Sequence, residues 1–119
     1  MLKITPELKV YLSTSATDMR CGMFSLSGKV SEVFGNNPLD GSLYVFMSRD
    51  KKKVKILMWD NDGYWLHYKR LGTGTFQIKL HDAGAEEITG VDLEKLLSGI
   101  SFERIKLSKK VKESLYKNR

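Results

Sequence analysis

The sequence has 119 residues, of which 41% are hydrophobic and 29% charged, so it has the length and composition of one folded domain rather than of a disordered segment. Its only cysteine, Cys21, excludes an internal disulfide and is typical of a reducing compartment. The N-terminus lacks the apolar stretch of a signal peptide, and no apolar run approaches the roughly 20 residues of a membrane span. We therefore expect a cytoplasmic protein with no membrane partner.

The formal net charge of +6 is concentrated in two parts of the chain. Residues 101–119 contain seven basic and two acidic side chains. A second group consists of Arg49, Lys51, Lys52, Lys53 and Lys55. Excess positive charge predicts a polyanionic partner, because neutralising phosphates releases their counterions. The alternative is that both groups are merely solvated, one as a tail and the other as a turn.

The first predicted elements are a strand and a helix. Residues 8–13 alternate in polarity, as a short strand does. Thr17 is a suitable N-cap for a helix that begins at Asp18, whose carboxylate favours the positive helix end. Apolar side chains at helical spacing then form one stripe: Met19, Met23, Leu26, Val30, Val33 and Phe34. Gly35 predicts the end of this amphipathic helix.

After that helix the apolar period becomes alternating, which predicts four strands. They span residues 42–49, 53–60, 64–71 and 75–81. Because the connections are short and turn-like, we expect hairpins and hence an antiparallel meander. Residues 83–90 are predicted as a loop and residues 91–100 as a short helix. Leu107, Val111 and Leu115 predict a second, basic amphipathic helix at the C-terminus.

Together these elements predict an α+β fold. We expect an antiparallel meander sheet of four to five strands, with an amphipathic helix on one face and short C-terminal helices. Residues 1–100 are expected to form a single α+β domain, and residues 101–119 a basic C-terminal tail or helix. The helix that begins at Asp18 is expected to cover the apolar face of the sheet.

The turns predict the register of the strands. Asn61-Asp62-Gly63 suits a three-residue turn with Gly63 in the left-handed position, which places Met58 opposite Leu66. The core face then carries Val54, Ile56, Met58, Leu66, Tyr68, Phe76, Ile78 and Leu80. The outer face carries Lys53, Lys55, Leu57, Trp59, Trp65, His67, Lys69, Gln77 and Lys79. A slip of one residue would move a strand's side chains to the opposite face.

Two tryptophans among lysines on the outer face leave three interpretations open. Trp59, Trp65 and His67, beside Lys55 and Lys69, suit a platform on which unpaired bases stack. Alternatively, a helix or the tail covers the tryptophans and makes them part of the core. In the third interpretation the face docks a protein partner, because interfaces are enriched in tryptophan, tyrosine and arginine.

Two stretches of the sequence carry a family resemblance. Val10 to Arg20 reads VYLSTSATDMR, a strand that runs into a Thr-Asp-Met-Arg entry. Asn37 to Phe76 contains a Pro and Gly turn, a Leu-aromatic-Val-Phe strand, a basic turn, a Lys-x-Leu-x-Trp-Asp strand and a Tyr-Lys-Arg-Leu strand. Both stretches resemble the accessory protein, TnpB type, that insertion sequences of the sixty-six family encode beside their transposase. The RNA-guided nuclease of the same name is unrelated.

The resemblance implies an accessory role in transposition, with the transposase chemistry on another chain. It covers roughly residues 8–100, and the basic tail from Ser101 matches no motif of the family. Cys21-Gly22-Met23 and the Gln-Ile-Lys that follows Phe76 also depart from the family's pattern. The implied partners are DNA at the transposon ends, the transposase and other element-encoded proteins, or a second copy of this chain. The implied location is the bacterial cytoplasm, in association with the nucleoid.

No catalytic constellation is recognisable, so we expect no enzyme activity, cofactor or metal. Neither His67 nor His81 has a nucleophile at a recognisable spacing. Asp60 and Asp62 flank a turn, where such side chains bond the local backbone, and they favour a turn over a Mg²⁺ site. The candidate nucleic-acid-binding residues are Arg49, Lys51, Lys52, Lys53, Lys55, Trp59, Trp65, Lys69, Arg70, Lys109, Lys110 and Lys112. The alternative function is a protein-interaction module without direct nucleic-acid contact.

Overall fold

The computed structural model describes residues 2–82 and 84–117, with side chains described as far as residue 111. Five strands form one sheet, in the order β4-β3-β2-β1-β5. The strands are β1 (Val10–Ala16), β2 (Leu43–Met47), β3 (Lys53–Asp60), β4 (Gly63–Arg70) and β5 (Ala85–Ile88). The helices are α1 (Met23–Lys29), its π-helical continuation η1 (Val30–Phe34), α2 (Gly90–Leu97) and α3 (Phe102–Lys117). The predicted α+β class is confirmed, as is the meander of β2, β3 and β4.

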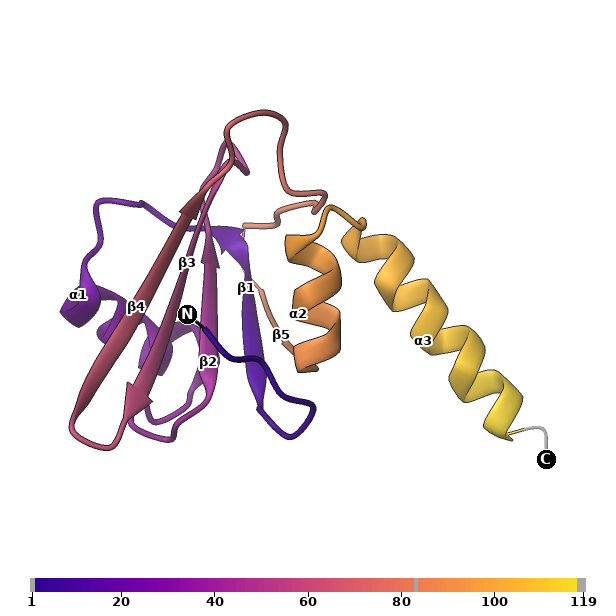
Figure 1. Cartoon of the computed structure of the whole chain (residues 1–119), viewed down its shortest axis with the longest axis horizontal. Helices are drawn as coiled ribbons and strands as arrows, with labels where there is room; N and C mark the ends of the chain where they lie inside the picture. The colour runs from indigo at the N-terminus through magenta and orange to yellow at the C-terminus, as the bar shows by residue number, and fades with distance from the viewer. Residues whose placement is uncertain (1, 83, 118–119) are drawn as a thin grey trace.

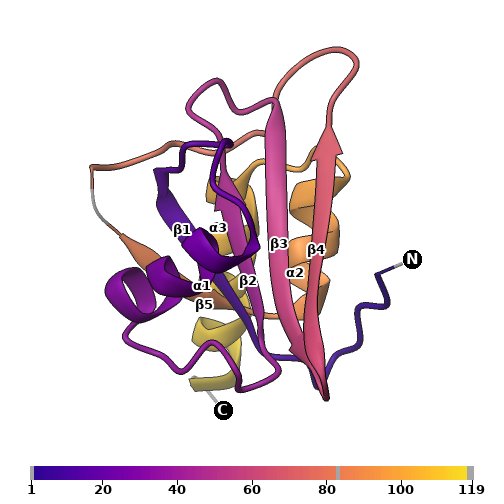
Figure 2. The same ribbon diagram turned by 90° about the vertical axis from the view of Figure 1, so that its left-hand side faces the viewer.

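Helices lie on both faces of the sheet, with α1 on one side and α2 and α3 on the other (Figures 1 and 2). The sheet therefore has two apolar cores, and its central strands are buried on both faces. The core beneath α2 and α3 is built from Val10, Leu12, Leu43, Val45, Met47, Val54, Ile56, Phe76, Ile78, Ile88, Leu93, Leu96, Phe102 and Ile105. The core beneath α1 and η1 is built from Leu26, Val30, Tyr44, Phe46 and Leu57. The helix of residues 23–34 thus covers the face of Leu57, and the prediction that it covers the face of Ile56 was wrong.

Near the edge of the sheet, the structure lacks one predicted strand and has another strand where a loop was predicted. Residues 75–81 form no strand, whereas residues 85–88, predicted as a loop, pair antiparallel with β1. Phe76 and Ile78, whose alternation predicted the strand, are buried in the core beneath α2 and α3 without belonging to a strand. The backbone N–H of Phe76 donates to the carbonyl of Lys51, and the N–H of Phe102 donates to the carbonyl of Gln77. β1 and β2 are parallel, joined by the α1–η1 crossover.

The first helix starts later than predicted. It begins at Met23 with Gly22 as N-cap, and the residues after Thr17 form a turn instead. Asp18 accepts from the backbone N–H of Arg20 and from its guanidinium, so its carboxylate caps this turn rather than a helix. The C-terminal end was predicted correctly, because Gly35 takes the left-handed conformation with φ 65° that a helix terminus favours.

The two C-terminal helices are tied to each other through a buried carboxylate. Asp92 and Thr89 form a capping box at the start of α2, and Lys109 of α3 lies 2.5 Å from the Asp92 carboxylate. Burial acts to raise the pKa of Asp92, but hydrogen bonds from Lys109 and Thr89 outweigh it and hold the pKa below its usual value. Lys106 adds a second tie, 3.0 Å from Glu86 of β5.

Helix α3 packs only through its beginning. Phe102 and Ile105 are buried, whereas Leu107 and Val111 are exposed by 62% and 52%. The predicted helix is present, but these two residues of its predicted apolar stripe lie outside the core of this chain. The side chain of Leu115, the third member of that stripe, lies outside the described residues.

Candidate nucleic-acid interface

The β3–β4 hairpin differs from the predicted one by a single residue. Its turn contains two residues, Asn61 and Asp62, and Gly63 pairs with Asp60. Asn61 takes the left-handed conformation, with φ 54°, which asparagine tolerates better than most residues. Met58 consequently pairs with Trp65 rather than with Leu66. The predicted register was wrong by one position, and every side chain of β4 lies on the face opposite to the predicted one.

The shift separates the two tryptophans. Trp65 shares a face with Met58 and is 56% exposed, and its indole N–H donates to Asp60 at 3.1 Å. Trp59 lies on the other face, half-buried, with its ring edge-on to Tyr64 at 5.0 Å between centroids. The prediction of one platform with both tryptophans is therefore wrong. Its residues divide into Trp65, His67 and Lys69 on one face and Lys55 and Trp59 on the other.

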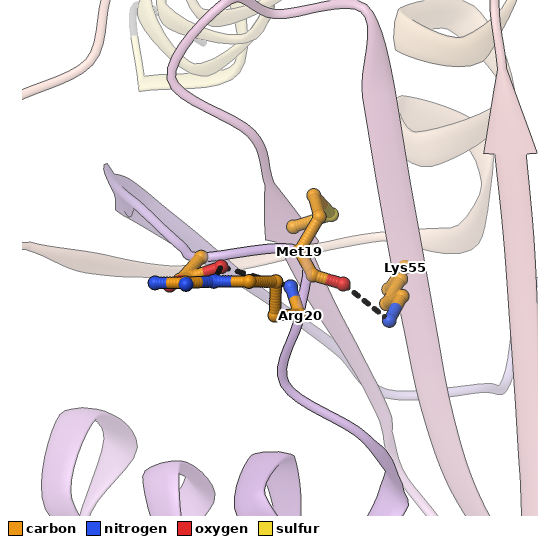
Figure 3. A network of polar contacts seen from close by, with 4 residues as sticks. Met19, Arg20 and Lys55 are labelled. Atoms are coloured by element: carbon orange, nitrogen blue, oxygen red, sulfur yellow. Dashed lines mark hydrogen bonds and ion pairs between the residues drawn. The ribbon is translucent and has the colours of Figure 1, made fainter.

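Lys55, predicted as a nucleic-acid contact, serves as an anchor inside the protein. Its side chain is buried, and Nζ donates at 2.8 Å to the carbonyl oxygens of both Met19 and Cys21. Figure 3 shows the ammonium pointing from β3 toward the turn between β1 and α1. Nζ also lies 5.5 Å from the centre of the Tyr68 ring. Lys55 thus holds the turn that carries Arg20 instead of offering a free charge to solvent.

Most of the other predicted cations converge at one end of the sheet. The β2–β3 turn and the end of β4 lie side by side, because Lys53 pairs with Arg70 and the N–H of Leu71 donates to the carbonyl of Lys52. Both connections project from the same end of the sheet in Figures 1 and 2. The turn after β1 adds Arg20. We call this set the basic end: Arg20, Arg49, Lys51, Lys52, Lys53, Lys69 and Arg70.

At the basic end lies a shallow hollow of about 600 Å³, and three of the seven cations line it, Arg20, Arg49 and Lys53. Its lining comes from the turn after β1, the β2–β3 turn and β4: Thr17, Asp18, Met19, Arg20, Ser48, Arg49, Asp50, Lys53 and Tyr68. Sequence reasoning missed Arg20 and Tyr68 here. Tyr68 was assigned to the core, yet the corrected register exposes 53% of it. Arg20 was seen only as part of a motif, and no sequence signal places it beside Arg49.

The two carboxylates at the hollow are already engaged. Hydrogen bonds from the Arg20 side chain and backbone lower the pKa of Asp18 to about 2. The Ser48 hydroxyl and the Lys52 backbone N–H lower the pKa of Asp50 to about 2 as well. Both acids are therefore ionised at neutral pH, each close to one cation, Arg20 or Lys53. Among the described residues, the remaining cations of the basic end form no ion pair.

The C-terminal candidates have different surroundings. Lys109 is bound to the buried Asp92, so its charge is used in holding α3 against α2. Lys110 is exposed. The side chains of Lys112, Lys117 and Arg119 lie outside the described residues. Of the tail's charges, the structure thus places Lys110 in solvent and Lys109 in an internal contact.

Within the described part of the chain, no group of three or more His, Cys, Asp or Glu side chains is arranged to hold a metal ion. Asp60 accepts from the Trp65 indole, so it orients that ring. Nor is any helix among these residues long and apolar enough to cross a membrane.

Comparison with known proteins places the chain among relatives of similar length. The family model described as IS66 Orf2 like protein matches residues 8–107. The uncharacterized protein y4hO of Sinorhizobium fredii is 41% identical over 102 residues, which cover 86% of this chain and 89% of that protein. A second uncharacterized protein of the same organism, y4jC, is 26% identical over 99 residues, covering 83% and 85%. No solved structure matches the chain.

Proposed function

The chain belongs to the IS66 Orf2-like family, whose role is an accessory one in transposition, and on that premise we propose that it is a non-catalytic protein that binds DNA through the basic end of its sheet. The expected ligands are the transposon ends, with the transposase as a further partner. The observation that carries the proposal is the convergence of seven cations from three separate segments at one end of the sheet, where three of them line one hollow. Phosphate oxygens are the natural ligands of such a cluster, because each contact releases condensed counterions.

The position of these cations favours contacts with the DNA backbone over base reading. They extend from turns and strand ends, whereas base readout in the major groove requires an inserted helix or ribbon. Phosphate contacts fix position and carry no sequence information by themselves. We therefore expect moderate affinity, steep salt dependence and weak sequence preference.

The test is a titration of labelled duplex DNA at two salt concentrations. The double variant Lys52→Ala/Arg70→Ala removes two exposed cations of the basic end. Lys9→Ala/Lys95→Ala is the matched control, because it removes the same charge from positions outside the basic end. We expect the first variant to weaken binding and to reduce the slope of log K against log salt by about 2, one for each lost phosphate contact. Equal losses in both variants, or binding indifferent to salt, would contradict the proposal.

The alternative, a protein-interaction module, is supported by a different surface. Leu107 and Val111 lie exposed on α3, and isolated apolar side chains at helical spacing are a common docking face. Under this alternative, Leu107→Asp/Val111→Asp abolishes capture of the transposase, and no nucleic acid binds at low salt. The salt titration therefore distinguishes the two functions directly.

Absence of catalysis is also part of the proposal. Purified protein incubated with transposon-end DNA and Mg²⁺ or Mn²⁺ is expected to leave the DNA intact. Cleavage that disappears in Asp60→Asn or Asp62→Asn would show instead that these turn carboxylates hold a catalytic metal.

A further inference from the structure

The outer strand of the sheet, β4, carries a row of aromatic and basic side chains, of which only Lys69 belongs to the basic end. We propose that this row, Trp65, His67 and Lys69 on one face of β4, binds a single-stranded segment of DNA, with an unpaired base stacked on Trp65. The inference deepens the proposed function and rests on it. It assigns unpaired DNA to β4 and leaves duplex phosphates to the basic end.

The three side chains share a face because alternate residues of a strand point the same way. The rings of Trp65 and His67 are nearly parallel, at 21°, with centroids 6.1 Å apart. The indole is more than half exposed, and its N–H bond to Asp60 fixes the ring orientation. A fixed, open aromatic face offers stacking area at little cost in conformational entropy.

Space for bases lies beside the row. One hollow of about 260 Å³ is bordered by Leu2, Lys3, Met58, Asp60, Trp65 and His67. A second, of about 330 Å³ and mostly apolar, borders His67 and Lys69 and is closed by Leu2, Ile4 and Leu97. The two hollows share Leu2 and His67 and so follow β4 one after the other. The apolar lining of the second hollow suits bases, and the polar groups of the row beside it suit phosphates.

The spacing of the row selects single strands. Alternate side chains of a strand are about 6.6 Å apart, roughly twice the ~3.4 Å rise per nucleotide of a duplex strand. A stacked strand leaves no room between its bases for a further ring, whereas an extended strand whose bases are about this far apart can take the Trp65 ring beside a base. β4 also lies at the edge of the sheet, so no further strand formed by the described residues covers its outer side (Figure 2).

The charges along β4 indicate how the bound strand lies on it. Lys69 and Arg70, which belong to the basic end, lie at one end of β4, whereas Asp60 and Asp62 lie near the other. Burial lowers the pKa of His67, so its ring is neutral at pH 7 and contributes stacking surface rather than charge. Phosphates therefore follow Lys69 toward Lys52, and the base held by Trp65 is the last one before the acidic turn.

The experiment uses the chain's own fluorescence. Trp59 and Trp65 are its only tryptophans, so Trp59→Phe makes Trp65 the single indole reporter. Titrate this variant with an oligodeoxythymidine and with a duplex of equal length, and follow binding in parallel by anisotropy of labelled DNA. We expect saturable quenching of Trp65 by the single strand and little quenching by the duplex.

Variants of Trp65 complete the test. Trp65→Ala should raise the Kd for the oligodeoxythymidine about tenfold, within the usual range for the loss of one stacked base. It should leave the duplex Kd within about twofold and the melting temperature nearly unchanged, because the ring is exposed. Trp65→Phe should restore most of the single-strand affinity. A single-strand Kd unchanged by Trp65→Ala, or anisotropy binding without quenching, overturns the inference.

The measurements distinguish failure of the proposed function from failure of this inference. Duplex binding that depends on Lys52 and Arg70 but shows no preference for single strands leaves the proposed function standing and overturns this inference alone. Absence of binding to either DNA at low salt overturns both.

Discussion

Replacing the buried Lys55 by methionine tests whether this cation is structural rather than a ligand contact. The substitution keeps the length of the side chain but removes two hydrogen bonds, those to the carbonyls of Met19 and Cys21. A bond from a charged donor contributes about 1.5–3 kcal/mol, and relief of the buried ammonium's desolvation returns part of the loss. We expect the free energy of unfolding to fall by about 1.5–3 kcal/mol. At about 4 °C per kcal/mol, the melting temperature falls by roughly 6–12 °C.

The matched control is Lys69→Met, which removes the same charge from an exposed position on the neighbouring strand. It should change stability by no more than about 0.5 kcal/mol, the usual range for surface substitutions, while it weakens DNA binding. Thermal unfolding followed by circular dichroism and urea titration measure the stabilities. A melting temperature of Lys55→Met within about 2 °C of the native protein would refute the structural role of this lysine.

Three further comparisons test the packing and the ion pair described above. Gly90→Ala should destabilise the protein by about 1–3 kcal/mol, because an added Cβ would lie 2.6 Å from a backbone oxygen of the N-terminal segment. Gly28→Ala should stabilise it by about 0.4–1 kcal/mol, because a Cβ at that position meets nothing within 4 Å. Urea titrations in which both variants are more stable, or both less stable, than the native protein would contradict this. Leu93→Ala should lower the free energy of unfolding by about 2–5 kcal/mol, whereas truncation of the exposed Leu107 to alanine should lower it by under about 0.5 kcal/mol. Equal shifts in melting temperature would show that α2 does not pack as described. The lowered pKa of Asp92 lies below its unfolded value near 3.9, so its contribution to stability is present above about pH 4 and is lost as the pH falls through the folded pKa. Asp92→Asn should therefore flatten the acid limb of the stability profile, and an unchanged limb measured from pH 5 to pH 2 would disprove the ionic tie.

The sequence determined the features that depend on local pattern. Alternating apolar residues predicted β2, β3 and β4, helical periodicity predicted α2 and α3, and Gly35 predicted the end of the first helix. The stretches from Val10 to Arg20 and from Asn37 to Phe76 predicted the family, because a resemblance depends on side-chain order rather than on spatial contact. The basic turn from Arg49 to Lys53 was likewise readable as an exposed, positively charged segment.

Tertiary structure decided which faces meet, and one residue in a turn had the largest effect. Whether Gly63 belongs to the turn or to β4 changes the local conformation little, yet it transfers Trp65, His67 and Tyr68 between faces because the side-chain period of a strand is two. The same holds at longer range. Residues 75–81 have the alternating pattern of a strand and residues 85–88 do not, yet the second segment is the one that pairs with β1. Arg20 lies near Arg49 because Lys55 and the backbone bond from Thr17 to Met47 hold the turn after β1 against β2 and β3. Such contacts join residues far apart in the chain, and local periodicity carries no information about them.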